Sequence, residues 1–184
     1  MSIKKPKIVV ILGPTASGKT RLGVHLADIF QGEIISADSR QVYRGMDVGT
    51  GKDLPDYELT LPDGSKKKIP YHLIDVVNPN DNFSLADWRR GAEKDISDII
   101  DRSRVPFIVG GTGLYLQALV DNYQLVDTTP NLAWRAEMEK LPASELLDKL
   151  QEINPKFVAG LNDSDSHNAR RLARYLEIFS APRA

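Results

Sequence analysis

The sequence predicts an α/β fold, in which a parallel sheet is flanked by helices and a helical appendage follows. Over residues 1–126, short apolar runs rich in β-branched residues alternate with segments of helical periodicity. This alternation is typical of a parallel sheet with right-handed crossovers. From about Asp127 onward every periodic segment is helical. We therefore predict two parts, an α/β core at 1–126 and an appendage at 127–184.

The first strand is predicted at 8–12, a continuously apolar run that ends at Gly-Pro and is typical of a strand buried on both faces. A helix is predicted over 19–30, with Gly32 as its C-terminal stop. Three further runs predict strands at 33–37, 72–77 and 106–109. Between the last two, Ser84 and Asp87 form a capping-box pattern that begins a helix with one apolar face. Trp88 lies on that face and is expected to be core.

A hairpin interrupts the alternation. The segments 57–61 and 66–69 flank Pro62-Asp63-Gly64-Ser65, which predicts a surface ribbon whose lysines at 66–68 form a solvated arm, with nucleic-acid contact as the lesser option. Beyond the core, helices are predicted at 132–141, 143–153, 155–161 and 166–179.

Composition narrows the class of protein. The chain has 184 residues, 41% hydrophobic and 27% charged, as in ordinary globular domains. Its net charge of −1 argues against coating nucleic acid or lipid through bulk charge, although residues 1–52 hold eight basic and four acidic residues. The absence of cysteine excludes disulfides and thiolate sites. The early apolar run is too short for a signal peptide or a membrane span, so we expect a cytoplasmic protein.

The strongest motif is GPTASGKT at 13–20, which fits G-x-x-x-x-G-K-[ST] between a predicted strand and a predicted helix. The glycines let backbone N–H groups converge on an anion, and the helix N-terminus adds partial positive charge. Lys19 supplies a full charge and the Thr20 hydroxyl can ligate Mg²⁺. We predict a P-loop NTPase-like core that binds a di- or triphosphate through Gly13, Pro14, Thr15, Ala16, Ser17, Gly18, Lys19 and Thr20.

Two carboxylates compete as partners of this loop. Asp38 ends the second predicted strand, and the carboxyl ends of parallel strands line the ligand crevice. It is interpreted as a general base or a water-mediated metal partner, with turn capping as the alternative. Asp75 ranks second, in a position like that of a Walker-B acid. The glycine-rich turn at 110–113 either reverses the chain or approaches a ligand, and places Thr112 in the same crevice.

Basic residues of the appendage form a further candidate. Arg170, Arg171 and Arg174 lie within about a turn of one predicted helix, and Arg135 belongs to the same part. These arginines either bind phosphates or form an exposed basic face. His25, His72 and His167 are scattered without ligand spacing, so a histidine metal site is not expected.

Five segments in this order resemble bacterial tRNA dimethylallyltransferases, also called tRNA isopentenyltransferases: GPTASGKT at 13–20, ADSRQVY at 37–43, GMDVGT at 45–50, HLID at 72–75 and VGGTGLY at 109–115. The resemblance implies that the P-loop binds the diphosphate of dimethylallyl diphosphate rather than ATP. It implies transfer of the dimethylallyl group to the N6 amine of the adenosine 3′-adjacent to the tRNA anticodon. A helical insertion would contact the tRNA.

The resemblance also implies roles for single residues. Asp38 matches the acid that hydrogen-bonds the adenine amine or accepts its proton, and Lys19 and Thr20 join it in the catalytic set. The implied contacts to tRNA are Asp38, Ser39, Arg40, Gln41, Thr112, Arg135, Arg170, Arg171 and Arg174. Mg²⁺ is expected on Thr20, the anticodon stem-loop as the partner, and a monomer as the working form.

The chain departs from the family at two places. The family usually has Thr-Ala-Lys-Pro where this chain has TGKDLP at 50–55, and the hairpin at 57–69 is longer than expected. Family members also continue well past residue 184, with arginines that reach the diphosphate. We therefore expect the 184-residue chain to bind dimethylallyl diphosphate with Mg²⁺ but to transfer it slowly or not at all.

Two other classes remain open from the residues alone. A small-metabolite or nucleotide kinase would bind ATP in the same loop, with Asp38 as the base and the appendage arginines as a lid. A GTP-driven switch is least favoured, because the sequence lacks an Asn-Lys-x-Asp guanine motif.

Overall fold

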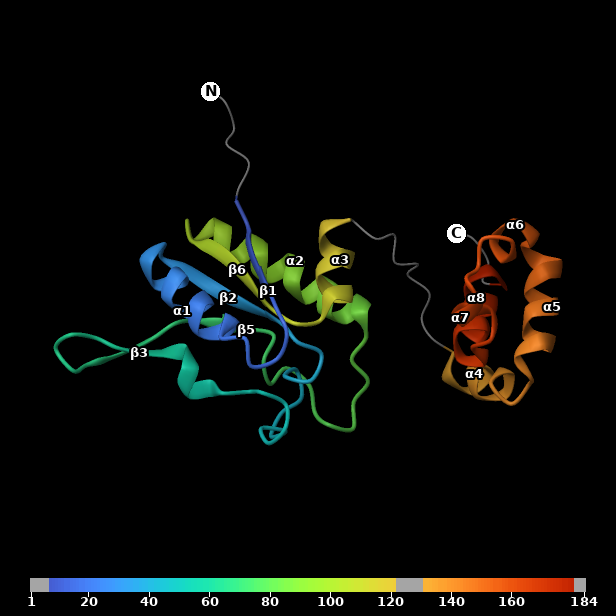
Figure 1. Ribbon diagram of the computed structural model, residues 1–184, viewed down its shortest axis with the longest axis horizontal. Helices are drawn as coiled ribbons and strands as arrows, with labels where there is room; N and C mark the ends of the chain where they lie inside the picture. Colours follow the sequence, from blue (N-terminus) through green and yellow to red (C-terminus); the bar gives the residue numbers. More distant parts are fainter. Residues whose placement is uncertain (1–6, 122–130, 181–184) are drawn as a thin grey trace, which may run out of the picture. The chain divides into compact units, whose positions relative to one another are not determined.

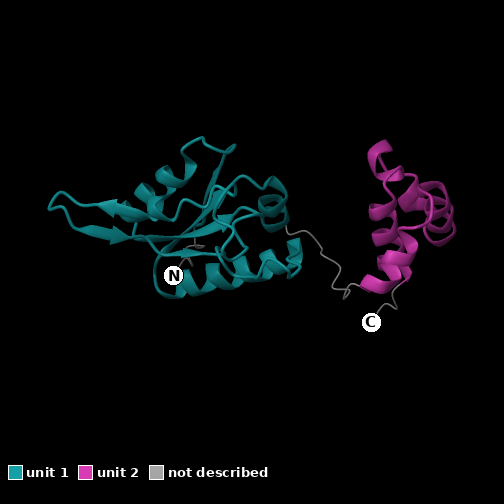
Figure 2. Ribbon diagram, turned by 90° about the horizontal axis from the view of Figure 1, so that it is seen from below, with its two compact units in different colours: residues 1–123 teal, residues 124–184 magenta. Residues whose placement is uncertain are grey.

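The computed structural model describes residues 7–121 and 131–180, which belong to two compact units (Figure 2). Residues 1–123 form the α/β unit and residues 124–184 form the helical unit. The boundary predicted between residues 126 and 127 lies outside the described residues.

The α/β unit is built on a parallel four-stranded sheet with the order β1-β6-β2-β5 (Figure 1). Its strands are β1 (Val9–Leu12), β2 (Gly32–Ala37), β5 (Tyr71–His72) and β6 (Val105–Gly110). Three helices pack on the sheet: α1 (Lys19–Ile29), α2 (Leu85–Asp101) and α3 (Gly113–Val120). Phe107 of β6 is in register with Val9 on one side and Ile34 on the other, so β6 is the inner strand beside β1. The predicted α/β class is confirmed.

Alternate residues of the strands build two cores on opposite faces of the sheet. Ile34 and Phe107 pack with Val24 of α1, whereas Ile35 and Ile108 pack with α2 and α3. Trp88 of α2 is fully buried in the core that contains Ile35 and Ile108, as predicted. Its indole N–H donates to the Ser36 carbonyl at 2.9 Å. Both faces of β2 and β6 are therefore covered, which explains their continuous apolar runs. The prediction that the first strand is buried on both faces is wrong: β1 is an edge strand whose Val9 and Ile11 pack with the core beside α1, whereas Val10 and Leu12 are exposed.

The segment predicted as a strand at 72–77 is mostly not one, and only Tyr71–His72 pairs with β2. Leu73 and Asp75 have φ values of +59° and +56°, which turn the chain away from the sheet. Leu73 and Ile74 still point into opposite cores, so the apolar pattern that predicted a strand is satisfied without one. A single parallel bridge, Tyr43 to Val77, is formed after the turn.

The predicted hairpin is confirmed as β3 (Glu58–Thr60) paired antiparallel with β4 (Lys66–Lys68), preceded by the 3-10 helix η1 (Leu54–Tyr57). Each lysine of β4 has an intramolecular partner. Lys66 pairs with Glu58 at 3.4 Å, Lys67 pairs with Asp28 at 2.6 Å, and the Lys68 ammonium lies 5.1 Å from the centroid of the Tyr71 ring. The three lysines of this arm therefore interact with groups of their own unit.

The helical unit contains α4 (Leu132–Met138), α5 (Ala143–Ile153), α6 (Pro155–Val158), α7 (Asp163–Ser166) and α8 (Ala169–Ser180). Leucines of α5 and α8 form its core: Leu146, Leu150, Leu172 and Leu176. The helix predicted from 166 begins at Ala169, because Asn162 caps the separate turn α7. Within the described ranges no helix is long and apolar enough to cross a membrane.

A buried carboxylate ties the start of β2 to neighbouring elements. The Glu33 side chain is 4% exposed and accepts from Arg102 at 2.9 Å and Arg104 at 3.1 Å, and it lies 2.7 Å from His72. Burial raises the pKa of Glu33, but the hydrogen bonds from Arg102 and His72 outweigh it, so the pKa lies below its ordinary value of 4.5. The cluster stabilises the fold above that pH.

Glu33→Gln is expected to lower the free energy of unfolding of the α/β unit by about 1–3 kcal/mol near pH 7, because two guanidinium groups lose a buried anion. A lowered folded-state pKa gives stability above the unfolded pKa that is lost as pH falls through the folded pKa. The difference between wild type and variant should therefore shrink below about pH 4. Urea unfolding in a Trp134→Phe background lets Trp88 report this unit. A pH-independent difference would contradict the assignment.

Candidate functional site

The loop at 13–18 joins β1 to α1 and is closed by its own hydrogen bonds. The Ser17 amide donates to the Pro14 carbonyl at 3.4 Å, and the Lys19 ammonium donates to the same carbonyl at 3.0 Å. Gly18 precedes α1 with a φ of +78°, a conformation that favours glycine. The loop therefore has the strand-loop-helix context that the motif requires.

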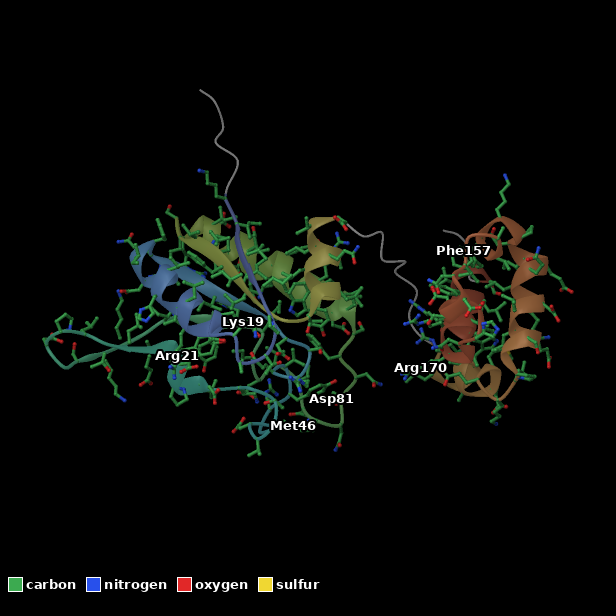
Figure 3. All side chains as sticks on the ribbon, viewed as in Figure 1. Lys19, Arg21, Met46, Asp81, Phe157 and Arg170 are labelled. Carbon is green, nitrogen blue, oxygen red and sulfur yellow. The ribbon has the colours of Figure 1, made fainter. Side chains whose placement is uncertain are left out.

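A cavity of about 310 Å³ lies against this loop. Its lining joins most of the phosphate loop to the end of β2 and to the segment that precedes the hairpin. The lining residues are Thr15, Ala16, Ser17, Gly18, Lys19, Thr20, Arg21, Asp38, Gln41, Thr50, Gly51, Asp53 and Asp56. Figure 3 labels Lys19 and Arg21 on α1. Gly13 and Pro14 belong to the loop but not to this lining.

Asp38 follows directly on β2 and lines the cavity with the phosphate loop. Its carboxylate accepts from the Arg40 amide at 2.9 Å, and the Arg40 guanidinium lies 3.9 Å away. The turn-capping role and the cavity-facing position are thus both present in one side chain. With its side chain 16% exposed, Asp38 is an acid held in a fixed orientation at the cavity wall.

The glycine-rich turn after β6 allows the backbones of three segments to meet. A Cβ on Gly110 would lie 2.2 Å from the Ala37 carbonyl oxygen, which only glycine permits. The Gly13 amide donates to the Gly110 carbonyl at 3.3 Å, and the Thr112 amide donates to Ala37 at 3.0 Å. The Thr112 hydroxyl accepts from the Ser39 amide at 3.1 Å. Close backbone packing therefore explains Gly110, and Thr112 is brought to the segment that contains Asp38.

Gln41 is the polar link between β2 and the loop that follows. Its side-chain carbonyl accepts from the Ser36 hydroxyl at 2.8 Å, and its amide donates to the Gly51 carbonyl at 2.9 Å. Gln41 and Gly51 both line the cavity. Asp75, the competing carboxylate, is instead 2.5 Å from the ammonium of Lys52 and does not belong to the cavity lining.

Sequence reasoning missed three charged residues of the cavity: Arg21, Asp53 and Asp56. The Arg21 guanidinium on α1 donates to Asp56 of η1 at 3.1 Å. Asp53 lies in the stretch at 50–55 where the chain departs from the family pattern, and Asp56 follows it directly, so the resemblance offered no role for either acid. Only the fold brings this stretch against α1.

In the helical unit, most of the predicted phosphate-contacting arginines are engaged with carboxylates. Arg135 and Arg174 each lie 2.6 Å from the same Glu177 oxygen, and Arg171 pairs with Asp165. Burial raises the pKa of Glu177, but the hydrogen bond from Arg135 and the Asn131 amide outweigh it, so the pKa is lowered. Arg170, labelled in Figure 3, is exposed. The unit thus presents a mixed surface of ion pairs rather than a purely basic face.

The parallel sheet, the loop between β1 and α1 and the cavity against that loop define an α/β protein of the P-loop class. The chain belongs to the IPP transferase family: residues 41–183 match the family of that description, and residues 6–60 match a second family described as isopentenyl transferase.

The curated relatives of the chain support the same family. The chain is 46% identical over 171 residues to tRNA dimethylallyltransferase 1 of Geotalea uraniireducens, covering 93% of this chain and 53% of the relative. It is 40% identical over 181 residues to tRNA dimethylallyltransferase of Bacillus cereus, covering 96% and 54%. The chain therefore spans about half the length of these curated relatives.

Two solved structures are similar. The full-length tRNA isopentenylpyrophosphate transferase of Bacillus halodurans aligns with a TM-score of 0.57 at 43% identity, over 95% of this chain and 55% of that one. A eukaryotic dimethylallyltransferase captured acting on tRNA aligns with a TM-score of 0.76 at 28% identity, over 95% and 42%.

Proposed function

We propose that this chain transfers a dimethylallyl group from dimethylallyl diphosphate to the N6 amine of the adenosine 3′-adjacent to the anticodon in tRNA. The observation that carries the proposal is the cavity in which Asp38 and the phosphate loop face the same space. Family membership and the names of the relatives support the reaction class. A protein that spans about half of such a relative is expected to hold at least the donor site.

The donor diphosphate fits the loop at 13–20. Backbone amides and the N-terminus of the 11-residue helix α1 offer hydrogen bonds and partial positive charge. Lys19 adds a full charge beside the cavity. These groups stabilise the diphosphate as negative charge builds up on it, which is the main electrostatic requirement of the reaction.

Magnesium fits this donor set. In the described part of the chain no three acidic or histidine side chains form a metal-binding group, so the protein would contribute mainly the Thr20 hydroxyl. Mg²⁺ ordinarily takes its other ligands from phosphate oxygens and water. When bound, it would neutralise charge on the leaving diphosphate.

The acceptor side is formed by the segment after β2. The carbon–oxygen bond of the donor breaks with its electron pair passing to the diphosphate, and the adenine nitrogen forms the new bond to that carbon. Asp38 orients the amine and accepts the proton that the nitrogen loses. Ser39, Arg40, Gln41 and Thr112 are proposed to contact the target nucleotide, which must leave its stack to reach the cavity.

The RNA itself is proposed to be held by the helical unit. Arg170 is exposed and can contact a phosphate directly. The other three arginines would contact phosphates while they are still paired with a carboxylate: Arg135 and Arg174 with Glu177, and Arg171 with Asp165. The proposed working form is a monomer, and the proposed compartment is the cytoplasm.

The test separates this function from a kinase. Calorimetry with dimethylallyl diphosphate and with ATP, each with Mg²⁺, is expected to show preference for the allylic diphosphate. A single-turnover reaction with the chain in excess over an anticodon stem-loop then counts even slow transfer, read as dimethylallyl adenosine by mass spectrometry. Preference for ATP, together with no modified adenosine, would contradict the proposal.

Asp56→Asn is expected to raise the affinity for inorganic diphosphate by about fivefold. The variant removes a negative charge from the cavity and releases Arg21 from its ion pair, and both effects favour an anion. Glu58→Gln is the matched control, because Glu58 pairs with Lys66 on the hairpin and does not line the cavity. Calorimetry that gave equal or weaker binding for Asp56→Asn would count against this arrangement of charge.

A further inference from the structure

Lys52 is a lysine whose side chain is completely buried. Its ammonium donates to the Tyr43 carbonyl at 2.7 Å, to Asp47 at 3.0 Å and to Asp75 at 2.5 Å. An ammonium has three N–H donors, and all of them are used here. Burial of such a charge is costly unless it is paired and hydrogen-bonded in this way.

These bonds close the segment from Tyr43 to Lys52 into a fixed loop. Lys52 reaches back to the carbonyl at its start, and within the loop the Thr50 hydroxyl donates to the Met46 carbonyl at 2.6 Å. Asp75 connects the loop to the turn that follows β5, and its own amide donates to the Gln41 carbonyl at 3.1 Å. One side chain thus joins residues that are 9 and 23 positions away in the sequence.

The loop ends at the cavity wall. Thr50 and Gly51, the two residues before Lys52, line the cavity, and the Gly51 carbonyl accepts from the side chain of Gln41. Gln41 is also a lining residue, three positions after Asp38. The position of this wall therefore depends on where the loop is held.

Lys52 itself does not line the cavity, although its neighbours do. Burial by itself lowers the pKa of the Lys52 ammonium, but the hydrogen bonds to Asp75 and Asp47 outweigh it and the pKa is raised. The ammonium stays charged at neutral pH, so its ties to the two carboxylates persist. This charge acts on protein groups and not on a ligand.

We infer that Lys52 is a positioning residue for the acceptor side of the cavity: it fixes the Tyr43–Lys52 loop, and through Gly51 and Gln41 it sets the wall beside Asp38. The inference rests on the proposed function. The phosphate loop is closed by separate hydrogen bonds, to Pro14 and to Gly110. Loss of Lys52 should therefore affect transfer to adenosine far more than donor binding.

The test compares wild type with Lys52→Met, which keeps the stem and removes the ammonium. We expect the Kd for dimethylallyl diphosphate to stay within about threefold. The single-turnover transfer rate should fall by about 10- to 100-fold, because the acceptor wall shifts. Amide hydrogen exchange of residues 43–52 should become faster by about tenfold, with that of residues 13–20 unchanged.

Asp47→Asn provides a milder change, because it replaces one of the two carboxylate partners of the ammonium, an exposed one, by a neutral amide, and it decides the question if Lys52→Met does not fold. Asp47→Asn should also leave the donor Kd unchanged, lower the transfer rate and speed the amide exchange of residues 43–52, each change being smaller than in Lys52→Met. Glu33→Gln is the control for stability, since it weakens the fold at the opposite end of β2 and should leave transfer unchanged. Unchanged transfer in both loop variants, or an equal loss in Glu33→Gln, would overturn the inference.

Failure of the proposed function has a different signature. A wild-type chain that neither binds the allylic diphosphate nor modifies adenosine contradicts the function. Equal exchange of residues 43–52 in wild type, Lys52→Met and Asp47→Asn contradicts the role of Lys52, whatever reaction the cavity performs.

Discussion

Replacing Lys19 with alanine is expected to abolish measurable binding of the diphosphate donor. The lysine begins α1, lines the cavity and supplies a full positive charge at the phosphate loop. Losing charge-assisted hydrogen bonds of this kind costs about 3 kcal/mol, or about 100-fold in affinity. Calorimetry with dimethylallyl diphosphate and Mg²⁺ measures the loss.

The fold should survive this change, because Lys19 contributes one hydrogen bond to Pro14 and little apolar volume. Circular dichroism and the thermal midpoint check that point. Lys66→Ala is the matched control: it removes an exposed lysine from the hairpin of the same unit, away from the cavity. If Lys19→Ala bound the donor as tightly as wild type, the assignment of the phosphate loop would be lost.

Asp38→Asn is expected to keep donor affinity and lose transfer. The amide has similar size and can still accept the Arg40 amide hydrogen bond, but it cannot take the proton from adenine. Removing a general base lowers the rate by about 100-fold or more. Single-turnover transfer to an anticodon stem-loop, together with calorimetry of the donor, separates the rate from the affinity.

Asp63→Asn is a suitable control for this variant. Asp63 accepts from the Ser65 amide two residues later at 2.9 Å, just as Asp38 accepts from Arg40, but it lies in the hairpin turn outside the cavity lining. Transfer at the wild-type rate in Asp38→Asn would reduce Asp38 to a turn-capping residue. Loss of donor binding in the same variant would instead assign Asp38 to the diphosphate.

Features that depend on neighbouring residues could be predicted from the sequence. The phosphate loop needs only a strand, a turn and a helix in succession, and it is found between β1 and α1. The capping box joins Ser84 to Asp87, three positions later, and the hairpin at 57–69 depends on its own turn. Asp38 followed from the rule that carboxyl ends of parallel strands share one edge.

The conformation of the 72–77 segment depends on tertiary contacts. Its apolar alternation suits a strand, yet Asp75 is held by Lys52, and the positive φ of Leu73 and Asp75 turns the chain off the sheet. No local pattern in that segment reports a lysine 23 positions earlier. Contacts with Gln41, Val42 and Lys52, all distant in the sequence, therefore hold this conformation.

The sequence by itself determined the α/β class, the phosphate loop, Asp38 at the end of β2 and the helical character of the C-terminal part. Only the tertiary structure placed Asp53 and Asp56 in the cavity and paired Arg135 with Glu177, 42 positions away. Periodicity and motifs record preferences over a few residues, whereas these contacts join side chains that chain folding brings together from distant positions. Charge compensation at the site is for this reason a property of the fold.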